Sequence, residues 1–262
     1  MSKRPPSPRQ NAIPPDRLPR RQFEEEMGGP SWIWGVHASL AALANPARTI
    51  ERVVATRNGA TRLPEGIEAH ILSPDAIDGM LPPGAVHQGL AVRASPLAPL
   101  ELEAACTPLD GRPVLVLDGV TDPQNVGAMF RSAAAFGARA LVLQDRKSPP
   151  LTGALAKAAA GAVEIVPHVR VSNIGRTVEE LRSWGYLTIG LEGESDAELE
   201  AALTPGRSVA FVLGAEGKGL RPGVSEVCEK RVRIPIAPGM ESLNVSVAAA
   251  IALYAAQRIR GS

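Results

Sequence analysis

Residues 114–143 read VLVLDGVTDPQNVGAMFRSAAAFGARALVL, and this stretch decides the predicted fold. It begins with four consecutive apolar residues, 114–117, a run typical of strands that are buried on both faces of a sheet. A helical spacing of apolar residues follows from Asn125 to Phe136, and a second apolar run occupies 140–143. The order strand, helix, strand predicts a parallel pair of strands joined by a crossover helix.

The same alternation continues to the end of the chain. We expect further strands at 163–166, 186–191 and 209–213, a short extended segment at 231–236, and helices at 153–160, 174–184 and 243–260. The pattern predicts an α/β fold in which a mostly parallel sheet is covered by helices on both faces. In such sheets ligands bind beyond the carboxyl ends of the strands, so a site is expected in the loops there.

Changes of composition divide the chain into four parts. Residues 1–30 are rich in proline and arginine and are expected to stay extended or disordered. Residues 31–105 form a first, small α/β unit, with a helix expected at 35–43 and strands at 50–55, 69–72 and 89–92. A linker at 106–111 leads to the second unit, 112–262.

Length and composition exclude several classes of protein. The chain has 262 residues, 45% hydrophobic and 21% charged, which is enough for a sizeable core and excludes a wholly disordered or fibrous chain. The best apolar stretch, 245–256, is shorter than the ~18 residues that a membrane span needs, so we expect no membrane contact. The net charge is +1, so a surface for a polyanion must be a local patch.

The cysteines and histidines predict neither a disulfide framework nor a metal site. Cys106 and Cys228 are the only cysteines, which fits a reducing cytoplasm. The four histidines are scattered, without the short spacings of metal ligands.

Three stretches carry candidate chemistry, and the first is 117–133. A buried strand ends there, and a polar turn leads into a helix that Asp122 or Asn125 can cap. Arg131 follows two turns into the helix, among small residues that allow close approach of a ligand. A plain helix with an exposed arginine is the alternative.

The second stretch, 212–220, is a glycine-rich loop after a buried strand. Lys218 is followed by glycine rather than serine or threonine, so the loop is not a phosphate loop, and the dinucleotide fingerprint GxGxxG is absent. Its glycines still permit backbone amides to approach a ligand. Glu216 is either a cap or a functional carboxylate.

The third stretch, 234–250, joins a short strand to a helix of small residues. Ser242 or Asn244 can be the N-cap of that helix. A capped, tightly packed core or interface helix would give the same pattern.

Together the three stretches resemble, in order and separation, the three motifs of the SpoU (TrmH-like, SPOUT superfamily) RNA 2′-O-ribose methyltransferases. The first unit is similar to the small substrate-binding domain of that family, with Trp34–Ala38 and His87–Gly89 matching typical segments. The resemblance covers about residues 32–260. It is greatest to the subgroup that methylates a guanosine ribose in large-subunit ribosomal RNA.

The resemblance implies a fold, a cofactor and a site. Family members have a trefoil-knotted catalytic domain, bind S-adenosylmethionine at the knot, need no metal, and form homodimers through the last helix. The matching positions for cofactor binding are Gly214, Ile234 and Leu243, with Leu213 and Ile236 beside them. The matching catalytic positions are Asn125, Arg131, Glu216, Ser242 and Asn244.

The implied reaction is an in-line displacement, in which a ribose 2′-oxygen attacks the sulfonium methyl group. Alignment of the two atoms and activation of the hydroxyl are then the tasks of the enzyme. A guanidinium does not readily lose a proton, so we interpret Arg131 as a clamp on a neighbouring phosphate, with Glu216 and Ser242 positioning or relaying the proton. Candidate RNA contacts are the tail, as a loose arm, and four arginines of the first unit: Arg52, Arg57, Arg62 and Arg93. The alternative is that the tail and these arginines are only solvated.

Two other functions remain open at this point. One is a tRNA ribose methyltransferase of the same family, and the other is a non-catalytic RNA-binding or assembly factor. A nucleotide-dependent oxidoreductase on a similar sheet is disfavoured because the glycine fingerprint is missing.

Overall fold

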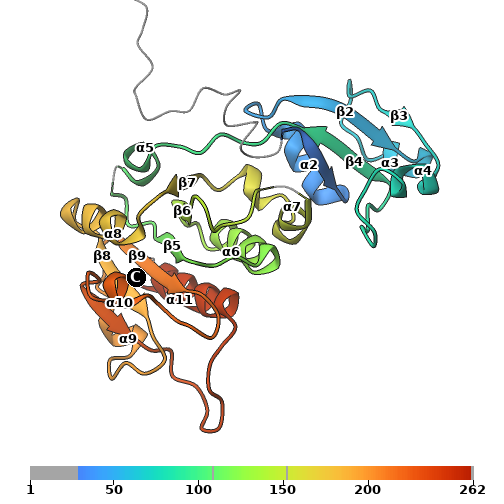
Figure 1. The fold of residues 1–262 in the computed structure, drawn as a ribbon. Helices are drawn as coiled ribbons and strands as arrows, with labels where there is room; N and C mark the ends of the chain where they lie inside the picture. Colours follow the sequence, from blue (N-terminus) through green and yellow to red (C-terminus); the bar gives the residue numbers. More distant parts are fainter. Residues whose placement is uncertain (1–28, 108, 152, 261–262) are drawn as a thin grey trace, which may run out of the picture.

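The computed structural model describes residues 29–107, 109–151 and 153–260, so the predicted tail lies almost wholly outside the described residues. Two sheets organise this part of the chain, a small one in blue and green and a larger one to its left in Figure 1. None of the helices in the described ranges has the length and apolar character that crossing a bilayer requires.

The larger sheet has six strands in the order β10-β8-β9-β5-β6-β7, and every neighbouring pair is parallel. The chain runs outward from β5 to β7, then crosses to β8, so the direction of winding reverses between β5 and β9. The carboxyl ends of the central strands therefore surround a switch point, where ligands of such sheets bind. The strands are β5 (Val114–Asp118), β6 (Ala140–Gln144), β7 (His168–Val171), β8 (Leu187–Leu191), β9 (Val209–Gly214) and β10 (Lys230–Val232).

Helices cover both faces of this sheet because alternate residues of its strands point to opposite sides. Leu115 and Leu117 of β5 belong to one apolar cluster, and Val114 and Val116 belong to another. The first cluster is completed by α6 (Pro123–Ala135), α7 (Gly153–Ala159), η1 (Ala162–Glu164), α9 (Leu199–Ala202) and α11 (Val245–Arg260). The second is completed by α5 (Leu102–Cys106), α8 (Ile174–Ser183) and α10 (Pro222–Ser225).

The smaller sheet has the order β1-β4-β2-β3, with antiparallel pairs except for β2 and β3. Its first strand lies directly after the tail, where no strand was predicted. Ala156 of α7 lies in the core of this sheet, so the two units share apolar contacts. The elements are β1 (Ser31–Trp34), α2 (Val36–Ala44), β2 (Ile50–Ala55), α3 (Arg57–Ala60), β3 (His70–Ile71), α4 (Pro74–Asp78) and β4 (Leu90–Ala94).

The strand predicted at 163–166 is wrong. Gly161, in the left-handed region at φ 92°, turns the chain into η1, and the strand begins only at His168. Val163 and Val166 are buried, whereas Ile165 is 70% exposed. Val163 and Val166 are three residues apart, as expected for one face of a helical turn. The sequence had suggested a strand because a charged residue stands between apolar ones.

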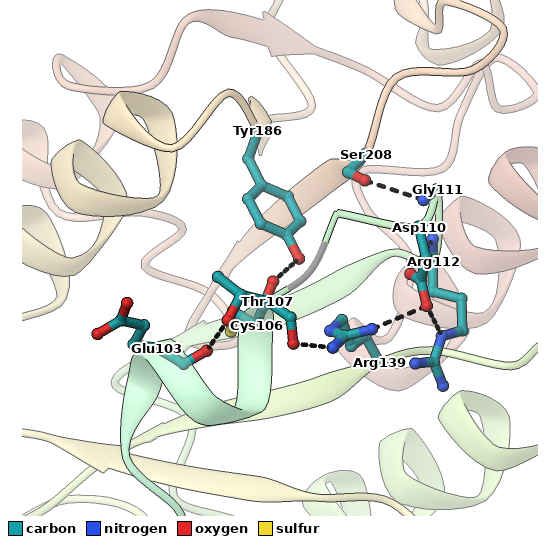
Figure 2. Close-up of polar contacts among 9 residues, drawn as sticks. All are labelled: Glu103, Cys106, Thr107, Asp110, Gly111, Arg112, Arg139, Tyr186 and Ser208. Atoms are coloured by element: carbon teal, nitrogen blue, oxygen red, sulfur yellow. Dashed lines mark hydrogen bonds and ion pairs between the residues drawn. The ribbon is translucent and has the colours of Figure 1, made fainter.

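Polar contacts around α5, drawn in Figure 2, hold the segment that connects the two sheets against the larger sheet. The Tyr186 hydroxyl donates to the carbonyl oxygen of Cys106 at 2.7 Å. Arg139 donates to Asp110 Oδ2 at 2.8 Å and also to the carbonyl of Thr107. These bonds tie the connection to the amino-terminal edge of the larger sheet, opposite the switch point.

A buried ion pair links the two units at a second place. Arg48, just after α2, donates through Nε and Nη2 to the carboxylate of Glu164 in η1, at 2.8–3.0 Å. Asn45 Nδ2 donates to the same carboxylate at 2.8 Å, and Arg48 Nη1 donates to the carbonyl oxygen of Ser95 at 2.7 Å. The side chains of Arg48 and Glu164 are 0% and 4% exposed. We call this pair the interdomain latch.

Substitution of Glu164→Gln is predicted to destabilise the protein, because it leaves the buried Arg48 guanidinium without a counter-charge. We expect the free energy of unfolding to fall by about 3–5 kcal/mol, measured by urea denaturation. The matched control is Glu229→Gln, which removes the half-exposed pair with Arg207 and should cost at most about 1 kcal/mol. Equal losses in the two variants would contradict the assigned role of the latch.

Candidate functional site

A cleft of about 1120 Å³ lies at the carboxyl ends of β8, β9 and β10. Because these strands are parallel, the loops that follow them meet at one edge of the sheet. The cleft is lined by the residues after β8 (191–194), by the end of β9 and its loop (213–220), and by the residues between β10 and α11 (232–236 and 240–245).

The loop after β9 doubles back on its own strand at Gly214. A Cβ atom at Gly214 would lie 2.0 Å from the carbonyl carbon of Gly219, a distance that no side chain permits. Gly217 and Gly219 have φ values of 72° and 64°, in the left-handed region that favours glycine. The glycines predicted to bring backbone close to a ligand thus close the loop that carries Glu216.

Asn244 connects three elements at the rim of the cleft. Its Oδ1 accepts from the backbone N–H of Ser246 at 2.9 Å and from the Ser246 hydroxyl at 2.6 Å, which caps α11. Its Nδ2 donates to Asn125 Oδ1 at 3.0 Å and to Glu216 Oε1 at 2.6 Å. Of the two N-caps proposed for this helix, Ser242 and Asn244, the structure therefore uses Asn244.

These bonds fix which atoms of Asn125 and Glu216 stay available. A backbone N–H only donates, so Oδ1 of Asn244 must face Ser246 and Nδ2 must face the other two side chains. Asn125 then presents Oδ1 to Asn244 and keeps its Nδ2 donor, while Glu216 keeps Oε2 as an acceptor. Among the described residues nothing else bonds to these two atoms, so a hydrogen-bond donor and a carboxylate oxygen lie together at the site.

The start of α6 is set by Asp122, whose Oδ1 accepts from the backbone N–H of Gln124 at 3.0 Å. Asp122, rather than Asn125, is the N-cap of the two that the sequence allows. Asn125 is thereby free to point to Asn244, and it is buried, with 7% of its surface exposed.

The five residues matched to cofactor binding all line the cleft: Leu213, Gly214, Ile234, Ile236 and Leu243. Ser242 lines it as well, and its side chain is exposed. Four acidic side chains line the cleft (Glu192, Glu194, Glu216 and Glu241), against two basic ones (Lys218 and Arg233). Arg233 is paired with Glu198, so the cleft favours a ligand with positive charge.

Arg131 does not join this hydrogen-bonded set. It lies on an exposed part of α6, and its side chain makes neither a hydrogen bond nor an ion pair with another described residue. Its guanidinium is available to a partner from outside the chain.

Sequence reasoning missed an ion pair behind the cleft. Asp118, at the buried end of β5, accepts from Arg221 Nε at 2.8 Å and from the Arg221 backbone N–H at 3.1 Å. The hydrogen bond to Asp118 raises the pKa of Arg221, so the guanidinium stays charged at neutral pH. The bond anchors the far end of the loop that carries Glu216. The only signal in the sequence was an acidic residue at the end of an apolar run.

Neither cysteine lines the cleft. Cys106 and Cys228 are buried and unpaired, and burial raises the pKa of each thiol to about 12. Within the described ranges, no group of three or more histidine, cysteine or acidic side chains could hold a metal ion.

Comparison with known proteins gives a consistent assignment. The model of the SpoU rRNA Methylase family matches residues 112–254. The 23S rRNA (guanosine-2′-O-)-methyltransferase RlmB of Vibrio cholerae is 39% identical over 242 residues, which cover 87% of this chain and 96% of that protein. RlmB of Xanthomonas campestris is also 39% identical, over the same shares of the two chains.

A solved structure agrees on the fold. The SpoU methyltransferase AviRb of Streptomyces viridochromogenes, in complex with AdoMet, superposes with a TM-score of 0.74. It is 21% identical and covers 91% of this chain and 96% of its own. On the family match and the similarity to RlmB, the chain belongs to the SpoU rRNA methylase family.

Proposed function

We propose that this protein transfers a methyl group from S-adenosylmethionine to the 2′-oxygen of a ribose, that of a guanosine in large-subunit (23S-type) ribosomal RNA. The observation that carries the proposal is the Asn125–Asn244–Glu216 set at the rim of the cleft. The substrate comes from the names of the RlmB relatives, which match this chain over most of its length.

The residues of the cleft fit S-adenosylmethionine. Leu213, Ile234 and Leu243 offer apolar contact, and the excess of carboxylates suits a cation. Gly214 lets the loop after β9 fold back against the strand, so that backbone rather than a side chain forms this part of the lining. When bound, this group supplies a methyl group made electrophilic by the adjacent sulfonium charge.

The chain's own residues would hold the ribose hydroxyl. Asn125 Nδ2 is the donor that orients the sugar, and Glu216 Oε2 is the acceptor for the hydroxyl proton. Asn244 is a positioning residue, because both polar ends of its amide are already bonded within the protein. Ser242 extends the proton path towards solvent. Arg131 binds a neighbouring phosphate, for which a guanidinium is well matched.

We also propose the features that the family resemblance implies. The second unit is knotted, and the first unit binds RNA, with exposed Arg52, Arg57, Arg62 and Arg93 as candidate contacts. The protein is a cytoplasmic homodimer joined through α11. In support of the dimer, α11 exposes Val247 and Tyr254 beside a row of alanines.

The test of the function is methyl transfer by the full-length protein. Labelled S-adenosylmethionine is offered with fragments of large-subunit ribosomal RNA or with bulk tRNA, and the product is mapped for 2′-O-methylation. We expect incorporation into one guanosine of the ribosomal RNA. Incorporation only into tRNA would establish the alternative substrate, and RNA binding without any transfer would establish a non-catalytic factor.

Glu216→Gln is predicted to lower kcat by about 10²- to 10⁴-fold, because the amide cannot take the hydroxyl proton. Binding of S-adenosylmethionine, measured by calorimetry, should be retained. Asn244→Ser is the companion variant: serine still caps α11 but cannot hold Glu216 or Asn125, so activity should fall while the far-ultraviolet circular dichroism spectrum of the folded protein is kept. Full activity of either variant would refute the assigned roles.

Arg131→Ala is predicted to weaken RNA binding rather than chemistry. The slope of log K against log salt should become shallower by about one unit, and the single-turnover rate at saturating RNA should be retained. Arg131→Lys should restore part of the affinity. Loss of transfer with unchanged RNA affinity would show that Arg131 acts on the reacting hydroxyl instead.

A further inference from the structure

A second hollow, a groove of about 810 Å³, lies between the first unit and the start of α6. No residue that lines the groove also lines the cleft. One wall consists of Trp32 and Trp34 of β1 and the loop 82–86. The opposite wall consists of Pro123 and Gln124 at the start of α6, Pro149 and Pro150, and the first turns of α7.

The walls of the groove are apolar and carry an aromatic face. Trp34 forms a buried floor, against which Gly153 of α7 packs so closely that a Cβ atom there would lie 3.2 Å from the indole. Trp32 is only partly buried and belongs to the lining. Val86, on the loop 82–86, is 65% exposed, a large apolar side chain without cover.

The charge of the groove is opposite to that of the cleft. Among the described residues, no acidic side chain lines the groove, and Lys157 is a basic one. Arg146 and Lys147 are exposed in the loop that leads to Pro149, and their side chains make no hydrogen bond or ion pair within the described ranges. Asp122 lies nearby, but its carboxylate caps α6. An anionic partner with an apolar, planar part fits this combination.

The groove also borders the reaction site. Gln124 lines it, and the next residue, Asn125, is hydrogen-bonded to Asn244 at the rim of the cleft. The exposed amide of Gln124 can meet the polar edge of a ligand. The Ser31 hydroxyl, also in the lining, is buried and has no hydrogen-bond partner among the described residues. Two adjacent residues of α6 thus face the groove and the rim of the cleft.

We propose that this groove binds an unstacked nucleobase of the substrate RNA, at or next to the target ribose, with Trp32 as the stacking surface. The proposal rests on the proposed function. Stacking on an indole suits any base, and the cations beside Pro149 would hold the flanking phosphates. The groove is then the part of the protein that holds the strand in register with Asn125 and Glu216.

The test is a thermodynamic cycle on RNA binding at equilibrium. The full-length protein is titrated with a ribosomal RNA fragment that carries the mapped methylation position, intact or made abasic at that nucleotide or at either neighbour. For the wild type we expect one of the three abasic sites to weaken binding by about 10- to 100-fold. For Trp32→Leu, which keeps apolar bulk without a π face, intact and abasic RNA should bind alike, and Trp32→Phe should restore most of the difference.

Trp184→Leu is the matched control, because Trp184 is a partly buried indole on the far side of the larger sheet. It should keep the discrimination between intact and abasic RNA. Two results would overturn the proposal for the groove alone, provided that the wild type transfers methyl groups. One is that no abasic site weakens RNA binding, and the other is that abasic sites weaken the binding of Trp32→Leu as much as that of the wild type. Absence of wild-type transfer would instead overturn the proposed function.

Discussion

The hydrogen bonds of the Asn244 amide are the constraint on which the site depends. One side chain caps α11 with its oxygen and holds Asn125 and Glu216 with its nitrogen. The start of α6, the loop after β9 and the start of α11 are therefore fixed by a single planar group. A flip of the Asn244 amide would break these hydrogen bonds, so its orientation is fixed. The orientation of the Asn125 amide and of the Glu216 carboxylate is therefore fixed too. This is how a site on three loops gains the rigidity that catalysis by alignment needs.

The cleft and the groove differ in the charge of the residues that line them. The cleft has more carboxylates than cations and suits a positively charged methyl donor, while the groove has lysine and tryptophan and suits RNA. The proposed sites for the base and for the methyl donor would then lie beside Gln124 and Asn125, two adjacent residues at the start of α6.

The sequence predicted the larger sheet well because its strands are buried on both faces. Such strands are continuous apolar runs, and 114–117 and 209–213 fell where strands lie. β1 was missed because Ser31–Trp34 is short and adjoins a proline-rich tail. The segment 163–166 was misread because a charged residue between apolar ones looks like a half-buried strand. The candidate residues of the cleft were found from motifs, but Asp118–Arg221 and Arg48–Glu164 join positions 103 and 116 residues apart, which no local pattern reveals.

The interdomain latch matters most for the groove, whose walls come from both units. If the first unit moved freely, the distance between Trp32 and the start of α6 would vary. Binding of RNA would then have to fix that distance, and the loss of conformational entropy would weaken the affinity. Arg48 and Glu164 are buried and bonded to each other, and Ser95 and Asn45 hold one of them each, so the position of the first unit is already fixed in the folded protein. Lys157 of α7, which donates to Gln88 Oε1 at 3.0 Å, adds a second link beside the groove itself. The groove is thus preorganised by contacts that lie outside it, and its shape follows from the way the two units are joined.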